Sequence, residues 1–158
     1  MANRHPIHDK LKTIPLFHDF NDVELEEFLH LADPKAFRAG EYIVQQGEEG
    51  NAMFYVAEGK CSVTATRDGA PVELDQLGAG DIFGEVSLFD QLPRSANVQA
   101  LTDCILLRVN EGVLRALAAF FPAAAFKFLL GIAREMGNRL RKTNKRYVDS
   151  VLAPHEQK

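Results

Sequence analysis

The spacing of apolar residues divides the chain into three zones. Residues 6–32 and 110–151 have apolar positions three or four residues apart, which predicts helices. Residues 35–109 instead have short apolar or alternating runs separated by glycines, which predicts strands. The sequence therefore predicts an α+β fold, an antiparallel β-roll or jelly-roll sandwich flanked by an N-terminal helical segment and C-terminal helices.

Local signals refine this outline. Asn21 or Asp22 is expected to cap a helix, because short polar side chains accept from the free N–H groups of a first turn. The sequence Arg67-Asp68-Gly69-Ala70 predicts a tight hairpin turn, since Asp-Gly tolerates positive φ. The strand runs are KAFRA, YIVQQ, MFYVAE, CSVTATR, VELDQL, ANVQAL and CILLRV, and the aromatic residues expected in the core are Phe54, Tyr55, Phe83 and Phe89.

The last helix is long, and it begins near Pro122. One apolar stripe runs along it for about six turns. We expect this stripe to cover its own domain, a second copy in a homodimer, or both. Its residues are Leu129, Ile132, Met136, Leu140, Thr143, Tyr147 and Val151.

Composition describes a single soluble domain. The chain has 158 residues, of which 46% are hydrophobic and 25% charged, with a net charge of −4. No segment has the pattern of a secretory signal or the apolar length to cross a bilayer, so we expect a cytoplasmic protein without membrane contact. Cys61 and Cys104 have no metal-ligand spacing and are predicted to be buried free thiols.

Charge is distributed unevenly. Acidic residues gather between Asp19 and Glu27, and a basic cluster occupies residues 139–146. This cluster is either a patch for nucleic acid or an acidic partner, or a solvated face whose charges complement the end of a helix. Its members are Arg139, Arg141, Lys142, Lys145 and Arg146.

Candidate chemistry lies in GAGDIFGEVSLFDQLPRSANVQA, which matches neither neighbouring period. Gly84 permits a tight turn, and Glu85 to Phe89 fit one short helical turn whose free N–H groups favour an anion. Arg94 and the Ser95 hydroxyl can bind a phosphate from the other side. Glu85 would repel a phosphate but can accept from a neutral hydroxyl, so the segment suggests a ribose phosphate.

The segment FGEVSLFDQLPRSA resembles the phosphate-binding cassette of cyclic-nucleotide-binding domains, as found in catabolite activators, protein kinase A regulatory subunits and cyclic-nucleotide-gated channels. The preceding FRAGEYIVQQGEEGNAMFYVAEGKCSVT and LGAGDIFGE are also similar to that family. The resemblance covers roughly residues 16–140. It implies one cyclic-nucleotide-binding domain over residues 1–158, with the β-roll and cassette at 35–109.

The resemblance also implies residue roles. Arg94 would pair with the cyclic phosphate, and Glu85 would accept from the ribose 2′-hydroxyl. Polar residues of the last helix would cover the base. A hydroxyl beside the arginine favours guanine in some relatives, whereas Ser95 also resembles bacterial members that prefer adenine, and of the two ligands we expect cyclic AMP ahead of cyclic GMP. The expected ligand-binding residues are Phe83, Gly84, Glu85, Val86, Ser87, Arg94, Ser95 and Ala96, and the base-cap candidates are Arg134, Asn138 and Arg139.

Other functions fit the sequence less well. Too few residues follow Tyr147 for a helix-turn-helix module, so DNA binding is not expected. An enzyme or a metal site is not expected either, because the histidines fall outside the strand zone: His5, His8, His18, His30 and His155. We therefore expect no cofactor and no metal, and a regulatory module that relays a helix rearrangement to an unknown effector protein. The alternative is a nucleotide-independent interaction module that retains the fold.

Overall fold

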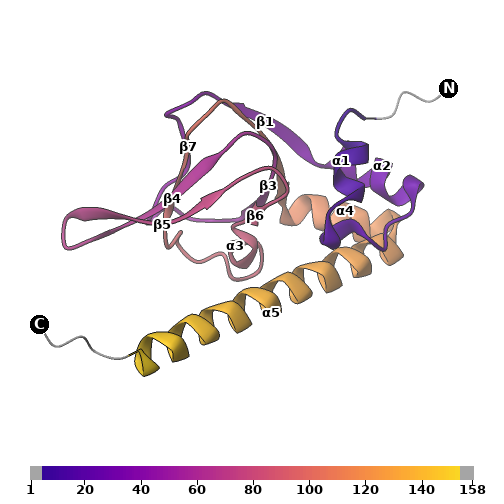
Figure 1. The fold of residues 1–158 in the computed structure, drawn as a ribbon. Helices are drawn as coiled ribbons and strands as arrows, with labels where there is room; N and C mark the ends of the chain where they lie inside the picture. The colour runs from indigo at the N-terminus through magenta and orange to yellow at the C-terminus, as the bar shows by residue number, and fades with distance from the viewer. Residues whose placement is uncertain (1–4, 154–158) are drawn as a thin grey trace, which may run out of the picture.

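The computed structural model describes residues 5–153, and Figure 1 shows a rolled β-structure with helices along one side and beneath it. The helices are α1 (His8–Lys12), the 3-10 turn η1 (Pro15–Phe17), α2 (Asp22–Leu31), α3 (Glu85–Asp90), α4 (Glu111–Phe120) and α5 (Pro122–Leu152). The strands are β1 (Asp33–Phe37), β2 (Tyr42–Val44), β3 (Ala52–Glu58), β4 (Cys61–Arg67), β5 (Ala70–Leu77), β6 (Ile82–Phe83), β7 (Asn97–Ala100) and β8 (Cys104–Asn110).

The strands form two antiparallel four-stranded sheets, with the orders β1-β8-β3-β6 and β2-β7-β4-β5. Strands β4 and β5 form the predicted hairpin, in which Arg67 pairs with Ala70. Asp68 and Gly69 between them have φ values of 54° and 80°, as this two-residue turn requires. The predicted fold class, a jelly-roll-like sandwich with helices at both ends, is confirmed.

Strand β3 separates two apolar cores. Residues 52–57 are buried on both faces, since one face of β3 lies inside the roll and the other lies under the helices. Phe54 and Val56 belong to the core inside the roll, whereas Met53 and Tyr55 belong to the core shared with the helices. A continuous apolar run such as MFYVA is typical of a strand covered on both sides.

The pair Ile82–Phe83, which the sequence indicates as the end of a strand, forms the short strand β6 beside β3. One detail differs from the sequence predictions. Phe89 was predicted in the core, and this prediction is wrong, because its side chain is 49% exposed. Helix α3 is only six residues long, and it buries Glu85, Ser87 and Leu88 rather than Phe89.

Helix α5 lies beneath the roll and is fastened to the N-terminal helices (Figure 1). Lys127 donates to both carboxylate oxygens of Glu24, at 2.9 and 2.8 Å, and Glu24 also closes the capping box with the N-cap residue Asn21. Gly131 lies against η1, where a Cβ atom would be 2.8 Å from the backbone oxygen of Leu16. The N-terminal helices and the first half of α5 therefore pack as one assembly.

The second half of α5 is different, because residues 141–152 are exposed on every side. Of the predicted stripe, Ile132 is buried in the core, but Leu140 and Tyr147 are 62% and 69% exposed. Among residues 5–153, no helix is both long enough and apolar enough to cross a membrane.

Candidate ligand-binding site

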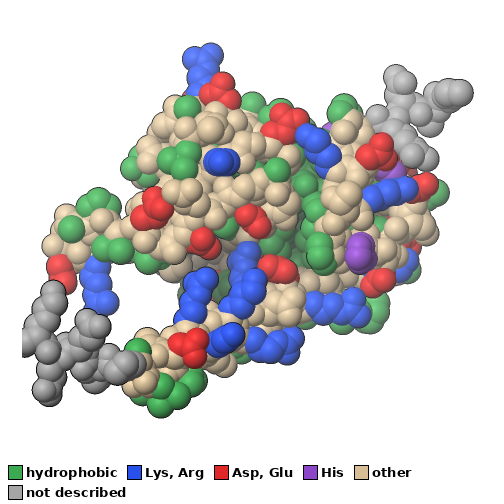
Figure 2. Space-filling view, in the orientation of Figure 1, with side chains coloured by type: hydrophobic (Ala, Val, Ile, Leu, Met, Phe, Trp, Pro, Cys, Tyr) green, Lys and Arg blue, Asp and Glu red, His purple; other side chains and the backbone are tan. Residues whose placement is uncertain are grey.

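A cavity of about 620 Å³ lies between the roll and α5. Figure 2 shows Lys and Arg side chains gathered along α5 where it faces the roll. The cassette contributes Phe83, Gly84, Glu85, Val86, Ser87, Arg94, Ser95 and Ala96; the strands contribute Val44, Val63, Asp75, Gln76, Leu77, Ile82 and Val98, with Asp81 just before β6; and α5 contributes Glu135, Arg139, Lys142, Thr143 and Arg146.

Gly84 brings the backbone of the cassette close to Arg94. Its φ of 76° is in the left-handed region, which glycine adopts without a steric penalty. A Cβ atom there would be 2.5 Å from Arg94 Nη1 and 3.0 Å from the backbone oxygen of Ala52. Both the turn and the close approach therefore require glycine, and α3 begins at the next residue, Glu85.

Arg94 is a partly buried cation that lacks a charged partner at hydrogen-bond distance among the described residues. Its Nη2 donates to the backbone oxygen of Ala52 at 2.8 Å, and its guanidinium carbon lies 6.0 Å from the ring centre of Phe54. Its Nη1 is buried and has no hydrogen-bond partner among residues 5–153. Burial lowers the pKa of Arg94, and the nearby charge of Arg108 lowers it further. An anion in the cavity would satisfy this cation.

Glu85 is the buried anion of the cavity, with only 5% of its surface exposed. Its carboxylate accepts from Nη1 of Arg139, which belongs to α5, and Nη2 of Arg139 donates to the backbone oxygen of Ile82. The Nε of Arg139 also lies 3.6 Å from a carboxylate oxygen of Glu135, one turn earlier on the same helix. Arg139 therefore joins α5 to the start of the cassette.

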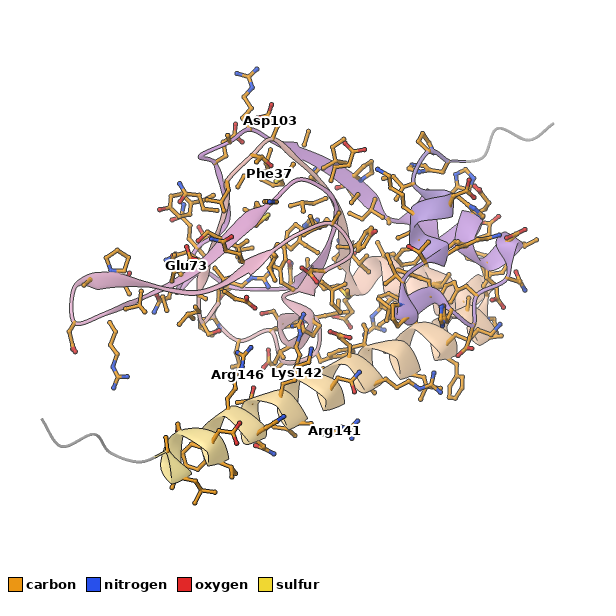
Figure 3. All side chains as sticks on the ribbon, viewed as in Figure 1. Phe37, Glu73, Asp103, Arg141, Lys142 and Arg146 are labelled. Carbon is orange, nitrogen blue, oxygen red and sulfur yellow. The ribbon has the colours of Figure 1, made fainter. Side chains whose placement is uncertain are left out.

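Three further α5 residues, Lys142, Thr143 and Arg146, line the cavity beside Arg139. Figure 3 shows Lys142 and Arg146 directed from α5 toward the roll and Arg141 directed to the opposite side. The spacing 139, 142, 143 and 146 places these side chains on one face of the helix.

All eight cassette residues selected from the sequence line the cavity, as does Arg139. The other two base-cap candidates do not line it. Arg134 lies 3.3 Å from the carboxylate of Asp19, and Asn138 accepts from Arg141 at 3.3 Å. Sequence reasoning missed Lys142, Thr143 and Arg146, although their spacing from Arg139 could have indicated them.

The histidines give no support to a site in the roll, since the described ones lie in or beside α1, η1 and α2. His155 lies outside the described residues. Cys61 and Cys104 are free and buried, as predicted, but their sulfur atoms are 3.8 Å apart in the core of the roll. Their separation in the sequence did not reveal this contact.

A partly buried cation and a buried carboxylate of the β-roll thus face the same cavity, an arrangement suited to a small polar ligand, and comparison with known proteins defines the class of the domain. Residues 34–119 match the model of the cyclic nucleotide-binding domain. The chain belongs to this family. The matched region includes the cassette and all of the roll except Asp33, the first residue of β1.

Curated relatives include regulatory and channel proteins. The chain is 31% identical over 129 residues to the cAMP-dependent protein kinase type II regulatory subunit of Drosophila melanogaster, covering 82% of this chain and 31% of the relative. It is 36% identical over 130 residues to a cyclic nucleotide-gated potassium channel of Rhizobium etli, covering 82% and 32%. The chain thus spans about a third of the length of these relatives.

Among solved structures, the chain is similar to the catabolite activator protein of Thermus thermophilus, with a TM-score of 0.74 and 32% identity. The similarity covers 84% of this chain and 61% of that chain. The likeness therefore extends beyond the cassette to most of the fold, including the arrangement of the two sheets.

Proposed function

We propose that this chain is a sensor of a cyclic nucleotide, with cyclic AMP as the preferred ligand, and that it relays binding to an effector protein through its helices. The observation that carries the proposal is that Arg94 and Glu85 line the same cavity. Arg94 offers a buried N–H group without a partner, and Glu85 offers buried acceptor oxygens. A ribose bearing a cyclic phosphate presents an anion and a neutral hydroxyl that match these two groups.

In the proposed complex, charged side chains and backbone N–H groups of the cassette both bind the ligand. Arg94 binds the phosphate oxygens, and the first N–H groups of α3 and the Ser95 hydroxyl supply further donors. Glu85 accepts from the ribose hydroxyl. Val63 and Val98 give the cavity an apolar wall on the roll side, which fits the face of a base.

Cyclic AMP is proposed over cyclic GMP for two reasons. Ser95 follows Arg94 as in the adenine-preferring bacterial members that the cassette resembles, and the Drosophila relative is the regulatory subunit of a cAMP-dependent protein kinase. The test is calorimetric titration of both nucleotides into the wild-type chain and into Arg94→Ala. The control is Arg115→Ala, which removes the same charge from an exposed residue paired with Glu111 on α4.

Removal of Arg94 should cost about 2–5 kcal/mol, as for truncation of one partner of a buried charge pair. This corresponds to roughly 30-fold to 5,000-fold weaker binding. Arg115→Ala should bind as the wild type does. Absence of heat with either nucleotide, together with an unchanged Tm, would refute the sensor and favour an interaction module that keeps the fold without the ligand.

Relay to α5 is proposed to run through Arg139. Because Arg139 and a bound ribose hydroxyl share the Glu85 carboxylate, occupation of the cavity changes the hydrogen bonds of α5 directly. The first half of α5 is fastened to α2 by the ion pair between Lys127 and Glu24. Its second half is exposed and available to a partner. Hydrogen exchange of α5 should change on saturation with nucleotide, and an identical pattern with and without ligand would exclude this relay.

The exposed stripe of α5 is proposed to bind a second copy of the chain. Its members follow steps of three, four and four residues, which keep them on one continuous face of the helix in an 11-residue repeat. Leu140, at 62% exposure, is the most informative position. Wild-type chain should sediment as a dimer and Leu140→Glu as a monomer, while Arg141→Glu, on the next residue, should remain dimeric. A monomeric wild type at high concentration, with and without nucleotide, would overturn this assembly.

A further inference from the structure

A second arginine, Arg108 of β8, approaches the end of the roll where Arg94 lies, although it does not line the cavity. Its direct neighbour across the strand pair is Phe54 of β3. Residues directly opposite in an antiparallel pair project from the same face of the sheet. The guanidinium carbon of Arg94 lies 6.0 Å from the centre of the Phe54 ring. Both arginines therefore reach the same end of the roll, beside one aromatic ring.

The hydrogen bonds of the two arginines end on consecutive residues. Arg94 Nη2 donates to the backbone oxygen of Ala52 at 2.8 Å, and Arg108 Nη2 donates to Oδ1 of Asn51 at 3.4 Å. Both acceptors are neutral, so neither hydrogen bond offsets the charge of its guanidinium group. Two cations are therefore held near each other by neighbouring, uncharged acceptors.

The carboxylates near this pair do not neutralise it. Asp33 is opposite Arg108 on β1, but its carboxylate forms an ion pair with Lys35 at 3.1 Å. No carboxylate of the described residues lies within ion-pair distance of Arg108. Burial lowers the pKa of Arg94, the charge of Arg108 lowers it further, and Glu48 raises it by a smaller amount. The surroundings of Arg94 in the ligand-free chain thus disfavour its charge.

We infer that Arg108 is a positioning residue for ligand binding: its charge repels Arg94 in the ligand-free chain and attracts the anion that Arg94 binds. The inference rests on the proposed function for the identity of that anion, a cyclic phosphate. An anion on Arg94 offsets the repulsion and is attracted by both cations. Arg108 therefore strengthens binding and lowers the stability of the ligand-free chain, and it does both without touching the ligand.

The first test measures cyclic AMP affinity by calorimetry in wild type, Arg108→Gln and Arg108→Lys. Glutamine keeps an N–H donor for Asn51 but removes the charge, whereas lysine keeps the charge. Arg108→Gln should bind roughly 3-fold to 10-fold more weakly, which corresponds to about 0.7–1.4 kcal/mol. Arg108→Lys should bind within about twofold of wild type, because the charge is retained.

The matched control is Arg67→Gln, which removes the same charge from an exposed residue at the end of β4 that does not line the cavity. This control should bind cyclic AMP as the wild type does. Wild-type affinity in Arg108→Gln would overturn the inference. An equal loss of affinity in Arg108→Lys or in Arg67→Gln would overturn it as well, since the effect would then not come from a charge beside Arg94.

The second test needs no ligand, so it separates failure of this inference from failure of the proposed function. Urea unfolding of Arg94→Gln, Arg108→Gln and the double variant gives the coupling between the two charges. Arg108→Gln should be more favourable to folding in the chain that retains Arg94, by a factor of about five in the unfolding equilibrium constant. Arg108→Gln alone should not lower the Tm, whereas loss of a purely structural side chain would lower it.

The outcomes of the two tests are distinct. A coupling near zero, a coupling of attractive sign, or a lower Tm in ligand-free Arg108→Gln would overturn the inference even if the wild type binds cyclic AMP. A repulsive coupling in a chain that binds neither nucleotide would support the interaction of Arg108 with Arg94 and refute the proposed ligand alone. If Arg94→Gln does not fold, the Tm and the affinity of Arg108→Gln decide the question.

Discussion

Arg139→Ala tests the link between the cassette and α5. The substitution leaves Glu85, whose side chain is only 7% exposed, without the cation that it contacts. Truncating one partner of a fully buried ion pair costs about 3–5 kcal/mol, whereas exposed pairs contribute about 0–1 kcal/mol. Arg139 is 39% exposed, so the pair lies between these limits. We expect the ligand-free chain to lose about 1–3 kcal/mol of unfolding free energy.

The assay is a double-mutant cycle by urea unfolding without nucleotide, with Arg139→Ala, Glu85→Gln and the double variant. Because the two side chains are in contact, the coupling free energy should be at least about 1 kcal/mol. The Tm of Arg139→Ala should fall by about 2–4 °C for each kcal/mol lost. Arg141→Ala is the matched control, since Arg141 lies two residues later and points away from the cavity (Figure 3).

A coupling free energy near zero would refute this reasoning, because it would mean that Arg139 does not interact with Glu85 in solution. An equal loss in Arg141→Ala would refute it as well, since the effect would then come from the helix and not from the ion pair. If the coupling is present, the same variant should bind nucleotide but transmit a smaller change in hydrogen exchange to residues 141–152.

Two other predictions concern packing. Gly131→Ala should destabilise the chain by about 1–3 kcal/mol, because the added Cβ atom overpacks against Leu16. Gly137→Ala on the same helix should stabilise the chain by about 0.5–1 kcal/mol, because the nearest atom to its Cβ would be 3.7 Å away. Urea unfolding measures both changes, and equal effects would contradict the close contact between Gly131 and Leu16. Burial, together with the adjacent Cys104, raises the pKa of Cys61 to about 12, so native Cys61 should resist iodoacetamide at about pH 8 and react only after unfolding. As the pH rises above about 8.5, the Cys61 thiol ionises in the unfolded chain before it does so in the folded chain, so the free energy of unfolding should fall. Rapid alkylation of Cys61 in the native protein would contradict the prediction of a protected thiol.

The cassette could be predicted because its parts are close in sequence. Gly84, Glu85 and Arg94 lie within one turn, one short helix and one strand entry, and chemical type alone assigns Arg94 to the proposed phosphate and Glu85 to the proposed hydroxyl. The strands were recognisable because β3 and β8 are apolar runs between turn residues. The pair Ile82–Phe83 was recognisable as the end of a strand, although two residues are too few to show a period.

Predictions failed where long-range packing decides the outcome. Helical period shows which α5 residues share a face, but not which face meets the cavity, so Arg139 could not be separated from Arg134 and Asn138. Phe89 was assigned to the core from its side chain alone, yet α3 is anchored by Leu88 and leaves Phe89 half exposed.

Glu85 can contact both Arg139 and the proposed ligand, because its carboxylate has more acceptor positions than a single hydroxyl uses. A carboxylate has two oxygens and about four lone-pair sites, so Arg139 and a ligand hydroxyl can be bound together. In the proposed relay, Arg139 stays in contact with Glu85 when a ligand binds, and only the sharing of the carboxylate oxygens changes. This arrangement requires an arginine, since one planar group must reach Glu85 and the Ile82 backbone at the same time. Arg139→Lys should therefore keep the charge but lose part of the coupling to Glu85, and full coupling in that variant would show that charge alone is sufficient.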